Sequence, residues 1–526
     1  MRGAHAAAGR GRARARVLSV VAAYGALASA CGGRAPEAAP GRPNVLLISI
    51  DTLRADRLSC AGYPRATTPH LDALAARGVR FTHAQSPRAK TTPALASLMT
   101  GLYPHDHGVR DLAQPLGGRA TTLAEVFAAN GWSTAAIVGN YVLQRALSGL
   151  DRGFETWIED LPDTNGVPPD DVPQRRATSL TDGALALLEE RAAAPSPWFV
   201  WLHYMDPHGA YDAPPEHRVF TSATRDLVPD PERPPPRGRQ EWIARYNVLE
   251  GERAGNRVDA NAVRDRYDAE VRYVDAELGR LFAALEARGL DRNTWVIVCA
   301  DHGESLGEHH YWFEHGRYAY EATCRVPLII APPRGAAAGG AAHGPRGVQR
   351  GDISLADLFP TLIELLALEG GQQRAPRGPH GRSRRSLLAA LDGPQRGDAS
   401  AAEDQGADAH PVFCEKVERA ELSGAVQTKA VRIGDWKLSR RFARRGRELV
   451  AVDEELFDLA ADPAEESNLA AEAPARAPLA ALRAALLEFC AADTDLADLG
   501  EALAREREAL RREDPEVDRR LRALGY

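Results

Sequence analysis

The sequence predicts an α/β protein in which buried, largely parallel strands alternate with helices. Segment 44–50 is an almost continuous apolar run, which is typical of a strand covered on both faces of a parallel sheet. Similar runs recur along the chain and are separated by segments with helical periodicity. Hydrophobic residues make up 44% and charged residues 26% of the 526 residues, which excludes a disordered chain and a fibrous repeat.

Individual elements follow from hydrophobic periodicity and from the residues that end helices. The predicted helix 267–288 carries an apolar stripe from Val271 to Leu285 and is ended by Gly289. A sheet of this class binds its ligands beyond the carboxyl ends of its strands. The predicted strands are 44–50, 133–138, 198–203 and 294–300, and the predicted helices are 68–77, 93–101, 123–130 and 267–288.

The composition divides the chain into a main domain and several smaller regions. The stretches 333–350 and 371–410 are rich in Gly, Ala, Pro and Arg, so we expect a loop and a flexible linker. Strand-like segments at 430–438 and 449–459 and a helix at 479–489 predict a C-terminal subdomain. The expected regions are a leader at 1–31, a linker at 32–43, the main domain at 44–370, the linker at 371–410, the subdomain at 411–490 and a charged helical tail at 491–526.

The first 31 residues have the order of a secretory signal. Four arginines between positions 10 and 16 precede an apolar stretch that ends in small residues and Cys31. The ending resembles a bacterial lipobox, although Leu27 lies one place further from the cysteine than usual. We therefore expect an exported protein, periplasmic or attached to the cell envelope, with membrane attachment through a lipidated Cys31. The alternative is a disordered leader. No apolar run reaches the roughly 20 residues of a membrane span.

Charge and cysteine content exclude further classes of protein. Lys and Arg number 65 against 72 Asp and Glu, and the net charge of −7 gives no reason to expect a nucleic-acid partner. The cysteines other than Cys31 are odd in number and scattered, which indicates neither a disulfide framework nor a zinc ribbon. They are Cys60, Cys299, Cys324, Cys414 and Cys490, and Cys299 is expected in the core because its neighbours are apolar. The oligomeric state is not indicated.

Two predicted strands end in acidic residues. Asp51 follows the first strand, and Asp301 with His302 follows the strand 250 residues later. Because parallel strands present their carboxyl ends at one edge of a sheet, these side chains are expected to form a site for one divalent ion. Zinc or manganese suits imidazole plus carboxylates better than calcium, although the geometry of the site can favour calcium. Each Asp alone can instead be a helix N-cap or a turn former.

A threonine is expected at the N-terminus of the helix 93–101. Pro93 suits the first turn and Thr92 the cap, so Thr91 would lie just outside the helix, where free N–H groups favour an anion. A hydroxyl there is suited to attack a phosphate-like or sulfate-like group. An ordinary capped helix is the simpler interpretation of this segment by itself.

Histidines follow two of the predicted strands. His203 alternates with apolar residues, which favours a position in the core or behind the ligands. His208 lies in the following loop, where it can face the crevice. Of the polar run 304–315, His315 is the best candidate for a functional role.

In chain order these features resemble the sulfatase-type members of the alkaline phosphatase superfamily. The resemblance extends from about residue 43 to residue 469, and no single segment carries it. The matching segments are 44–56, 67–72, 93–105, 207–208, 267–275, 300–304, 325–327, 357–361, 436–438, 455–459, 462–465 and 468–469, with 521–526 similar to the ends of many members.

The resemblance implies a fold and a set of residue roles. The fold would be a three-layer α/β/α sandwich with a central, mostly parallel sheet, plus a small C-terminal antiparallel sheet with a helix. The metal ligands would be Asp51, Asp301, His302 and Thr91, and Thr91 would also be the nucleophile. His208 and His315 would bind or protonate the leaving group. The substrate would be an anionic ester of phosphate or sulfate.

Three departures from the sulfatase pattern favour a Thr-nucleophile branch. Sulfatases carry Cys or Ser where Thr91 stands and convert it to formylglycine, an aldehyde that Thr cannot give, and Leu95 replaces the arginine of that motif. Thr52 replaces the second of two usual aspartates, and 139–142 lacks the usual lysine. We expect a metal-dependent ester hydrolase with a covalent intermediate on Thr91. The alternatives are a phosphoethanolamine- or phosphoglycerol-type transferase, or a non-catalytic anion-binding relative.

Overall fold

The computed structural model describes most of the chain between residues 41 and 493. The predicted leader, nearly all of the 32–43 linker and the tail beyond 493 lie outside it. In the part of the chain described, no helix is long and apolar enough to cross a bilayer. The described residues are 41–162, 174–192, 196–229, 242–243, 247–335, 347–369, 385–392, 410–417, 427–445, 448–472 and 479–493.

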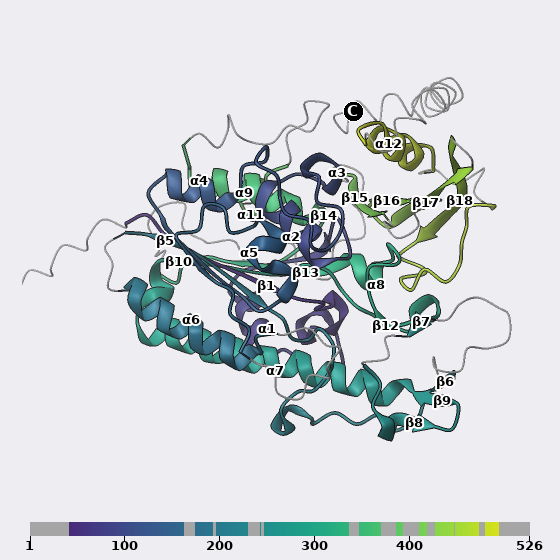
Figure 1. Cartoon of the computed structure of the whole chain (residues 1–526), viewed down its shortest axis with the longest axis horizontal. Coiled ribbons are helices and arrows are strands. Elements are labelled where there is room, and N and C mark those ends of the chain that lie inside the picture. Colours follow the sequence, from purple (N-terminus) through teal and green to yellow (C-terminus); the bar gives the residue numbers. More distant parts are fainter. Residues whose placement is uncertain are drawn as a thin grey trace, which may run out of the picture. The chain divides into compact units, whose positions relative to one another are not determined.

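A mixed sheet of eight strands forms the centre of the main domain (Figure 1). β13 runs antiparallel to both of its neighbours, and every other pair in the sheet is parallel. The prediction of a mostly parallel sheet is therefore confirmed. In sheet order the strands are β14 (Gly347–Ser354), β2 (Val79–Gln85), β13 (Arg325–Ala331), β10 (Thr294–Ala300), β1 (Asn44–Ile50), β5 (Trp198–Tyr204), β3 (Ser133–Val138) and β4 (Thr156–Ile158).

Helices cover both faces of this sheet. Figure 1 shows α1 (Pro69–Ala76), α6 (Ala177–Ala192) and α7 (Ala260–Ala287) below it. Above it lie α2 (Thr91–Thr100), α4 (Leu123–Ala129) and α9 (Leu358–Leu365). The central strand β1 is buried along all seven residues, which explains why its sequence is apolar almost throughout. The three-layer α/β/α arrangement expected from the sequence is confirmed.

Helix α7 begins seven residues before the predicted start at 267. Its apolar stripe continues backwards through Val263 to Ala260, and both side chains are fully buried. Charged residues at 264–266 interrupt the pattern in the sequence and conceal this extension.

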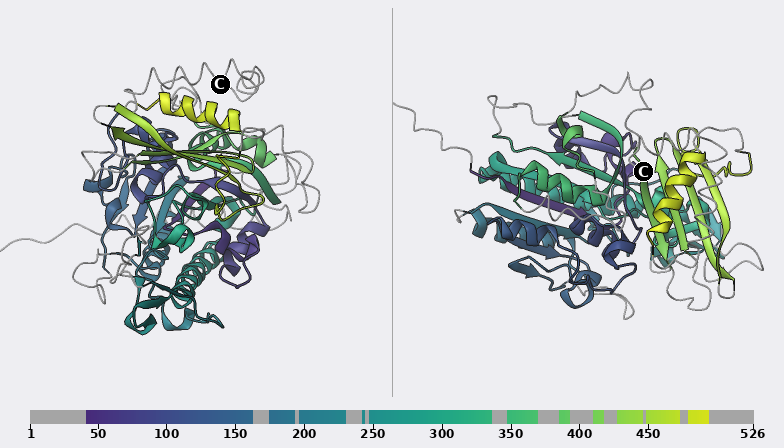
Figure 2. Two further views of the ribbon diagram at one scale, coloured as in Figure 1. Left: turned by 90° about the vertical axis from the view of Figure 1, so that its right-hand side faces the viewer. Right: turned by 90° about the horizontal axis from the view of Figure 1, so that it is seen from above.

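The C-terminal subdomain is an antiparallel sheet with a helix across it, as expected (Figure 2). Its strands are β15 (Val412–Val417), β16 (Gln427–Ile433), β17 (Trp436–Arg445) and β18 (Glu448–Asp458), and α12 (Leu479–Ala491) packs on β16 and β17. The single strand expected at 430–438 is wrong. Gly434, with φ of 60°, turns the chain there and makes a hairpin.

Two expected irregular stretches contain regular structure. β14 begins at Gly347, within the loop expected at 333–350, because it pairs with β2. α11 (Leu388–Asp392) lies within the linker expected at 371–410, and Leu387 and Leu391 are buried in the main core. A few apolar residues in this otherwise polar stretch are therefore enough to pack helix α11 against the main core.

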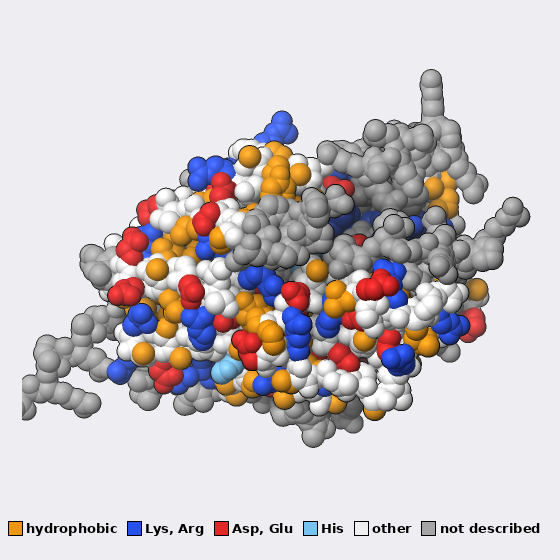
Figure 3. Space-filling model, turned by 60° about the horizontal axis from the view of Figure 1, so that its bottom comes forward, with side chains coloured by type: hydrophobic (Ala, Val, Ile, Leu, Met, Phe, Trp, Pro, Cys, Tyr) orange, Lys and Arg blue, Asp and Glu red, His pale blue; other side chains and the backbone are white. Residues whose placement is uncertain are grey.

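The surface carries charges of both signs. On the face in Figure 3, acidic and basic side chains lie in small, intermingled groups with hydrophobic side chains between them. Helices α6 and α7 are joined by such a pair, Arg280 with Asp182 at 2.7 Å. Surface pairs of this kind contribute little to stability, on the order of 0–1 kcal/mol.

Candidate active site

The helix that carries Thr91 begins two residues earlier than the sequence predicted. Helix α2 begins at Thr91, with Lys90 as its N-cap residue, whereas we expected Thr92 as the cap and Thr91 outside the helix. The first helical hydrogen bond runs from the N–H of Ala94 to the carbonyl of Lys90. Pro93 is tolerated in this first turn because an N–H there would have no acceptor within the helix.

Side chains from distant parts of the chain converge at the carboxyl edge of the sheet. The hydroxyl of Thr91 lies 3.4 Å from Oδ2 of Asp51 and 3.4 Å from Nε2 of His302. The same imidazole nitrogen is 3.6 Å from Oδ1 of Asp51 and 3.5 Å from Oδ2 of Asp301. All four residues are buried. The structure therefore brings together the four residues for which the sequence suggested a metal site.

The backbone next to Asp51 is held in an unusual conformation. Thr52 has a φ of 55°, which is costly for a β-branched residue. Its N–H points to Oδ1 of Asp301 at 3.3 Å, and its carbonyl accepts a hydrogen bond from Tyr267 at 2.8 Å. These two hydrogen bonds hold the backbone of Thr52 in this conformation, and they thereby fix the position of the neighbouring Asp51 in the cluster.

Several polar atoms in this cluster are buried without a hydrogen-bond partner among the described residues. They are Oδ1 of Asp51, Oγ1 of Thr52, Nε2 of His203 and Oδ2 of Asp301. A buried, unpaired polar atom is costly, and three such carboxylate and imidazole atoms close together fit a cation. Ligand atoms of Asp51, His203 and Asp301 lie within 4.8 Å of one another. The residues present therefore form a possible Asp/His metal site.

His203 contributes more to this cluster than its sequence context suggested. Its Nδ1 is 2.8 Å from the hydroxyl of Ser49, and its Nε2 is 3.5 Å from Oδ2 of Asp51. The register of β1 against β5 pairs Ser49 with His203, which explains why both side chains turn to one side. The signal in the sequence was a histidine and a serine inside two otherwise apolar strands.

Asn140 is a second residue that the sequence did not single out for the cluster. Its amide nitrogen donates to Oδ2 of Asp51 at 2.6 Å. In the sequence, its segment 139–142 stands out only for the missing lysine. A neutral amide in this position orients the carboxylate without adding a charge.

The two buried aspartates have pKa values that are shifted in opposite directions. Burial and then the charge of Asp51 raise the pKa of Asp301 well above its usual range. Burial acts in the same direction on Asp51, but the close contact with His203 and the charges of nearby histidines lower its pKa below the usual value. Two buried carboxylates this close retain a proton unless a cation compensates them.

The two predicted proton-transfer histidines lie together beside the cluster. The rings of His208 and His315 have centroids 5.1 Å apart, and His315 lies 4.4 Å from the ring of His302. Nδ1 of His208 contacts the carbonyl of Gly209 at 2.9 Å, and Nδ1 of His315 lies 3.1 Å from a carboxylate oxygen of Glu304. The structure thus brings both near the residues of the possible metal site.

Their environments differ in electrostatic terms. Burial and then the charge of His208 lower the pKa of His315 to about 4. Burial opposes protonation of His208 too, but the charges of Asp51 and Glu304 outweigh it and raise its pKa above the usual value. Burial raises the pKa of Glu304 to about 7. His208 therefore holds a proton more readily than His315 does.

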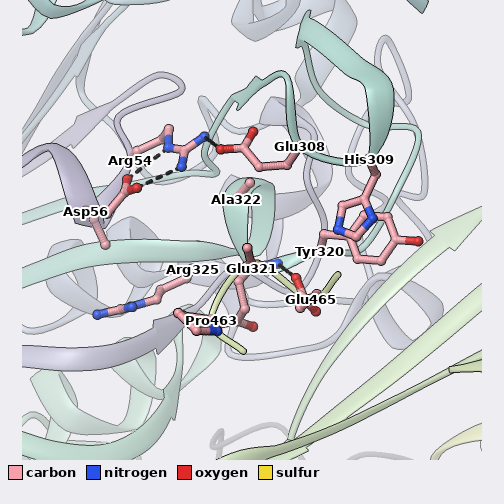
Figure 4. A pocket seen from close by; sticks show the side chains of 12 residues that line it. Arg54, Asp56, Glu308, His309, Tyr320, Glu321, Ala322, Arg325, Pro463 and Glu465 are labelled. Atoms are coloured by element: carbon pink, nitrogen blue, oxygen red, sulfur yellow. Dashed lines mark hydrogen bonds and ion pairs between the residues drawn. The ribbon is translucent and has the colours of Figure 1, made fainter. Parts of the chain in front are cut away.

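A cavity of about 250 Å³ lies between the main domain and residues 463–465, and the residues of the cluster do not line it. In Figure 4, Arg54 reaches both Asp56 and Glu308, and the ring of His309 stacks on Tyr320. Arg54 also donates to the carbonyl of Glu304 at 2.9 Å. It thus links the wall of this cavity to the loop that carries Glu304.

A second group of potential metal ligands, His105, Glu415 and Asp493, lies elsewhere. The ammonium group of Lys429 contacts the carboxylates of both Glu415 and Asp493, and Arg110 also pairs with Asp493. Protein cations already compensate this cluster, so it is an ion-pair network rather than a second metal site.

Comparison with known proteins identifies the family. The sulfatase family model matches residues 43–368. The chain belongs to the sulfatase family. An ulvan-active sulfatase of Formosa agariphila is 29% identical over 348 residues, which are 62% of this chain and 62% of that protein. The chain therefore covers less than two thirds of that relative.

Solved structures share the fold of this sulfatase family member. One is described as a complex with its substrate D-glucosamine-2-N,6-O-disulfate. It has a TM-score of 0.65 at 20% identity, and the match covers 86% of this chain and 99% of that chain. Phosphonate monoester hydrolase of Agrobacterium radiobacter has a TM-score of 0.59 at 23% identity, with coverage of 90% and 96%. The likeness includes the C-terminal subdomain and confirms the expected alkaline-phosphatase-like architecture.

Proposed function

We propose that this sulfatase family member is a metal-dependent hydrolase of sulfuric or phosphoric esters that uses Thr91 as its nucleophile. The observation that carries the proposal is the contact of the Thr91 hydroxyl with both Asp51 and His302 in a buried cluster of unpaired ligand atoms. A binding module has no need of a hydroxyl in that position. Sulfatases and phosphonate monoester hydrolases among the similar proteins act on esters of this class.

Asp51, Asp301, His302 and Thr91 would hold one divalent ion, with His203 as a further candidate ligand. The donor set of carboxylate and imidazole favours zinc or manganese, with calcium as the alternative. When bound, such an ion lowers the pKa of a hydroxyl and neutralises charge on a phosphate or sulfate oxygen.

The protein's own residues would divide the remaining work. Thr91 begins helix α2, whose free N–H groups favour the anionic group of the substrate. The Thr91 hydroxyl gives up its proton to solvent water, and the Thr91 oxygen attacks the central phosphorus or sulfur atom. The bond to the ester oxygen breaks, and a covalent adduct on Thr91 forms. His208, whose pKa is raised, donates a proton to the leaving oxygen, and His315 with Glu304 orients it. Water then releases the anion from Thr91.

Of the two ester classes, the phosphoric one suits this cluster better. Formylglycine, which sulfatases use, requires Cys or Ser, and position 91 is Thr. A secondary alcohol as nucleophile is similar to the superfamily's phosphodiesterases and transferases. A transferase would pass the group to an acceptor alcohol instead of water and is the second candidate.

The deciding experiment compares matched esters. The purified protein, reconstituted with zinc or with manganese, is assayed on an aryl sulfate, an aryl phosphate monoester, an aryl phosphodiester and an aryl phosphonate with the same leaving group. We expect turnover of at least one phosphorus ester and a mass increase on the peptide containing Thr91 after an acid quench. Thr91→Ala should lose more than about 10³-fold in rate, whereas Thr92→Ser should retain the activity. Full activity of Thr91→Ala with the metal bound would refute the nucleophile.

We also propose export to the periplasm or cell envelope, from the leader in the sequence and its Cys31. Fractionation of the expressing cells, with mass analysis of the mature N-terminus, distinguishes a lipidated Cys31 from a cleaved or retained leader.

A further inference from the structure

Two cysteines that are far apart in the sequence lie against each other in the fold. Cys324 ends the short helix α8 (Glu321–Cys324) of the main domain, and Cys414 lies in β15 of the C-terminal sheet. Their sulfur atoms are 2.9 Å apart, although 90 residues separate them in the chain. Among the described cysteines, this is the one pair for which a sulfur–sulfur contact is found.

The same short segment holds both cysteines in place through the backbone. The carbonyl of Cys324 accepts the N–H of Ser86 at 2.7 Å, and the N–H of Glu415, next to Cys414, donates to the carbonyl of Pro87 at 2.9 Å. Both sulfurs also belong to a small apolar cluster with Ala89, Ala319 and Ala430. The pair is thus built around residues 86–89, which lead directly to Thr91.

We propose that Cys324 and Cys414 form a disulfide that ties the C-terminal sheet to the segment carrying the nucleophile. The two thiols lose two protons and two electrons, and one sulfur–sulfur bond forms. A disulfide oxidant, either a small-molecule disulfide or an oxidised dithiol protein, accepts the electrons and becomes two thiols. The sulfurs need to approach by less than about 1 Å to reach the usual bond length of about 2.05 Å.

The surroundings of the pair indicate when the bond forms. The exposed fractions of Cys324 and Cys414 are 0% and 5%, so an oxidant cannot reach them in the finished fold. Burial and the contact with Cys414 also raise the pKa of the Cys324 thiol, which lowers its reactivity. The bond therefore forms while β15 docks, in an oxidising compartment, and the finished fold protects it from reduction.

The linkage is tested directly on the whole protein. Protein refolded with oxidised and reduced glutathione is unfolded without reductant, alkylated and digested. We expect the peptides containing Cys324 and Cys414 to be joined, and two fewer alkylated cysteines than in a sample refolded with dithiothreitol. Alkylation of both cysteines in the glutathione sample, or a bond from either of them to a different cysteine, would overturn the proposal.

Variants separate the disulfide from simple packing. The bond would close a loop of 90 residues, and reducing it in the wild type should lower the melting temperature by roughly 3–6 °C. Cys324→Ala and Cys414→Ala should show no difference between oxidised and reduced samples. Cys60→Ser, which removes a partly exposed cysteine outside the pair, should retain the full difference. Equal melting temperatures of the oxidised and the reduced wild-type protein would contradict a stabilising disulfide between Cys324 and Cys414.

Discussion

Nε2 of His203 lies 3.5 Å from Oδ2 of Asp51, inside a cluster to which both strands β1 and β5 contribute. The two residues are separated by 152 positions in the sequence, and the parallel register of the strands brings them together. The imidazole is fixed from behind by Ser49. The imidazole is held in one orientation, and its Nε2 makes no hydrogen bond among the described residues while it faces the carboxylate of Asp51. It is therefore arranged as a ligand for a cation.

Replacement of His203 therefore tests the extent of the metal site. We expect His203→Ala to weaken metal affinity by about 10- to 100-fold, because a ligand or its orienting partner is lost. Elemental analysis and metal titration measure this effect independently of activity. Trp201→Phe, which removes another hydrogen bond to Ser49, is the matched control and should change metal affinity far less. Equal metal content in His203→Ala and the wild type would limit His203 to a structural role.

Removal of the metal should destabilise the protein as well as inactivate it. Without a cation, Asp51 and Asp301 remain buried close together, and Asp301 has to take up a proton instead of binding an ion. We expect chelation to lower the melting temperature and added zinc or manganese to restore both stability and activity. Differential scanning calorimetry with and without each metal provides the measurement. A melting temperature that changes neither with chelator nor with added metal would argue against an ion in this cluster.

The role of His208 predicts a dependence on the leaving group. If it protonates the departing oxygen, His208→Ala should slow esters of poor leaving groups, such as simple alcohols, by about 10²-fold or more. Activated nitrophenyl esters should be affected much less, since nitrophenolate departs without a proton. A series of esters of graded leaving-group pKa gives the slope in each variant. Equal losses across the series would point to substrate positioning instead.

Lys429 anchors the C-terminal sheet through a buried ion-pair network. Its ammonium group contacts Glu415 and Asp493, and all three side chains are at most 1% exposed. We expect Lys429→Met to cost about 3–5 kcal/mol, because it removes the buried cation shared by Glu415 and Asp493 and leaves Asp493 with Arg110 alone. Chemical denaturation measures this loss. Glu415→Gln combined with Lys429→Met should recover part of it, since one of the stranded charges is then removed.

The same network predicts acid sensitivity. Burial alone would raise the pKa of Glu415, but Lys429 and His105 lower it well below the usual value of 4.5. Below about pH 4.5 the unfolded chain then binds more protons than the folded one. The stabilisation is present above that pH and is lost as the pH falls. Melting temperatures between pH 3 and pH 7 should show a shallower acid-side decline in Glu415→Gln than in the wild type.

The sequence by itself predicted the fold class and pointed to the four residues that meet in the buried cluster. Short apolar runs such as 44–50 are typical of strands covered on both faces, and Asp51 and Asp301 follow two of them at one edge of the sheet. Periodicity was less informative wherever charged residues or turns interrupted it, as at the start of α7 and at Gly434.

Only the tertiary structure decided which side chains meet. Strand register placed His203 and Asn140 against Asp51, and the docking of β15 brought Cys414 to Cys324. Contacts of this kind join residues about 90 to 150 positions apart, and no local pattern encodes such a pairing. Periodicity reports which face of an element is buried, whereas the packing of whole elements decides which buried atoms face each other.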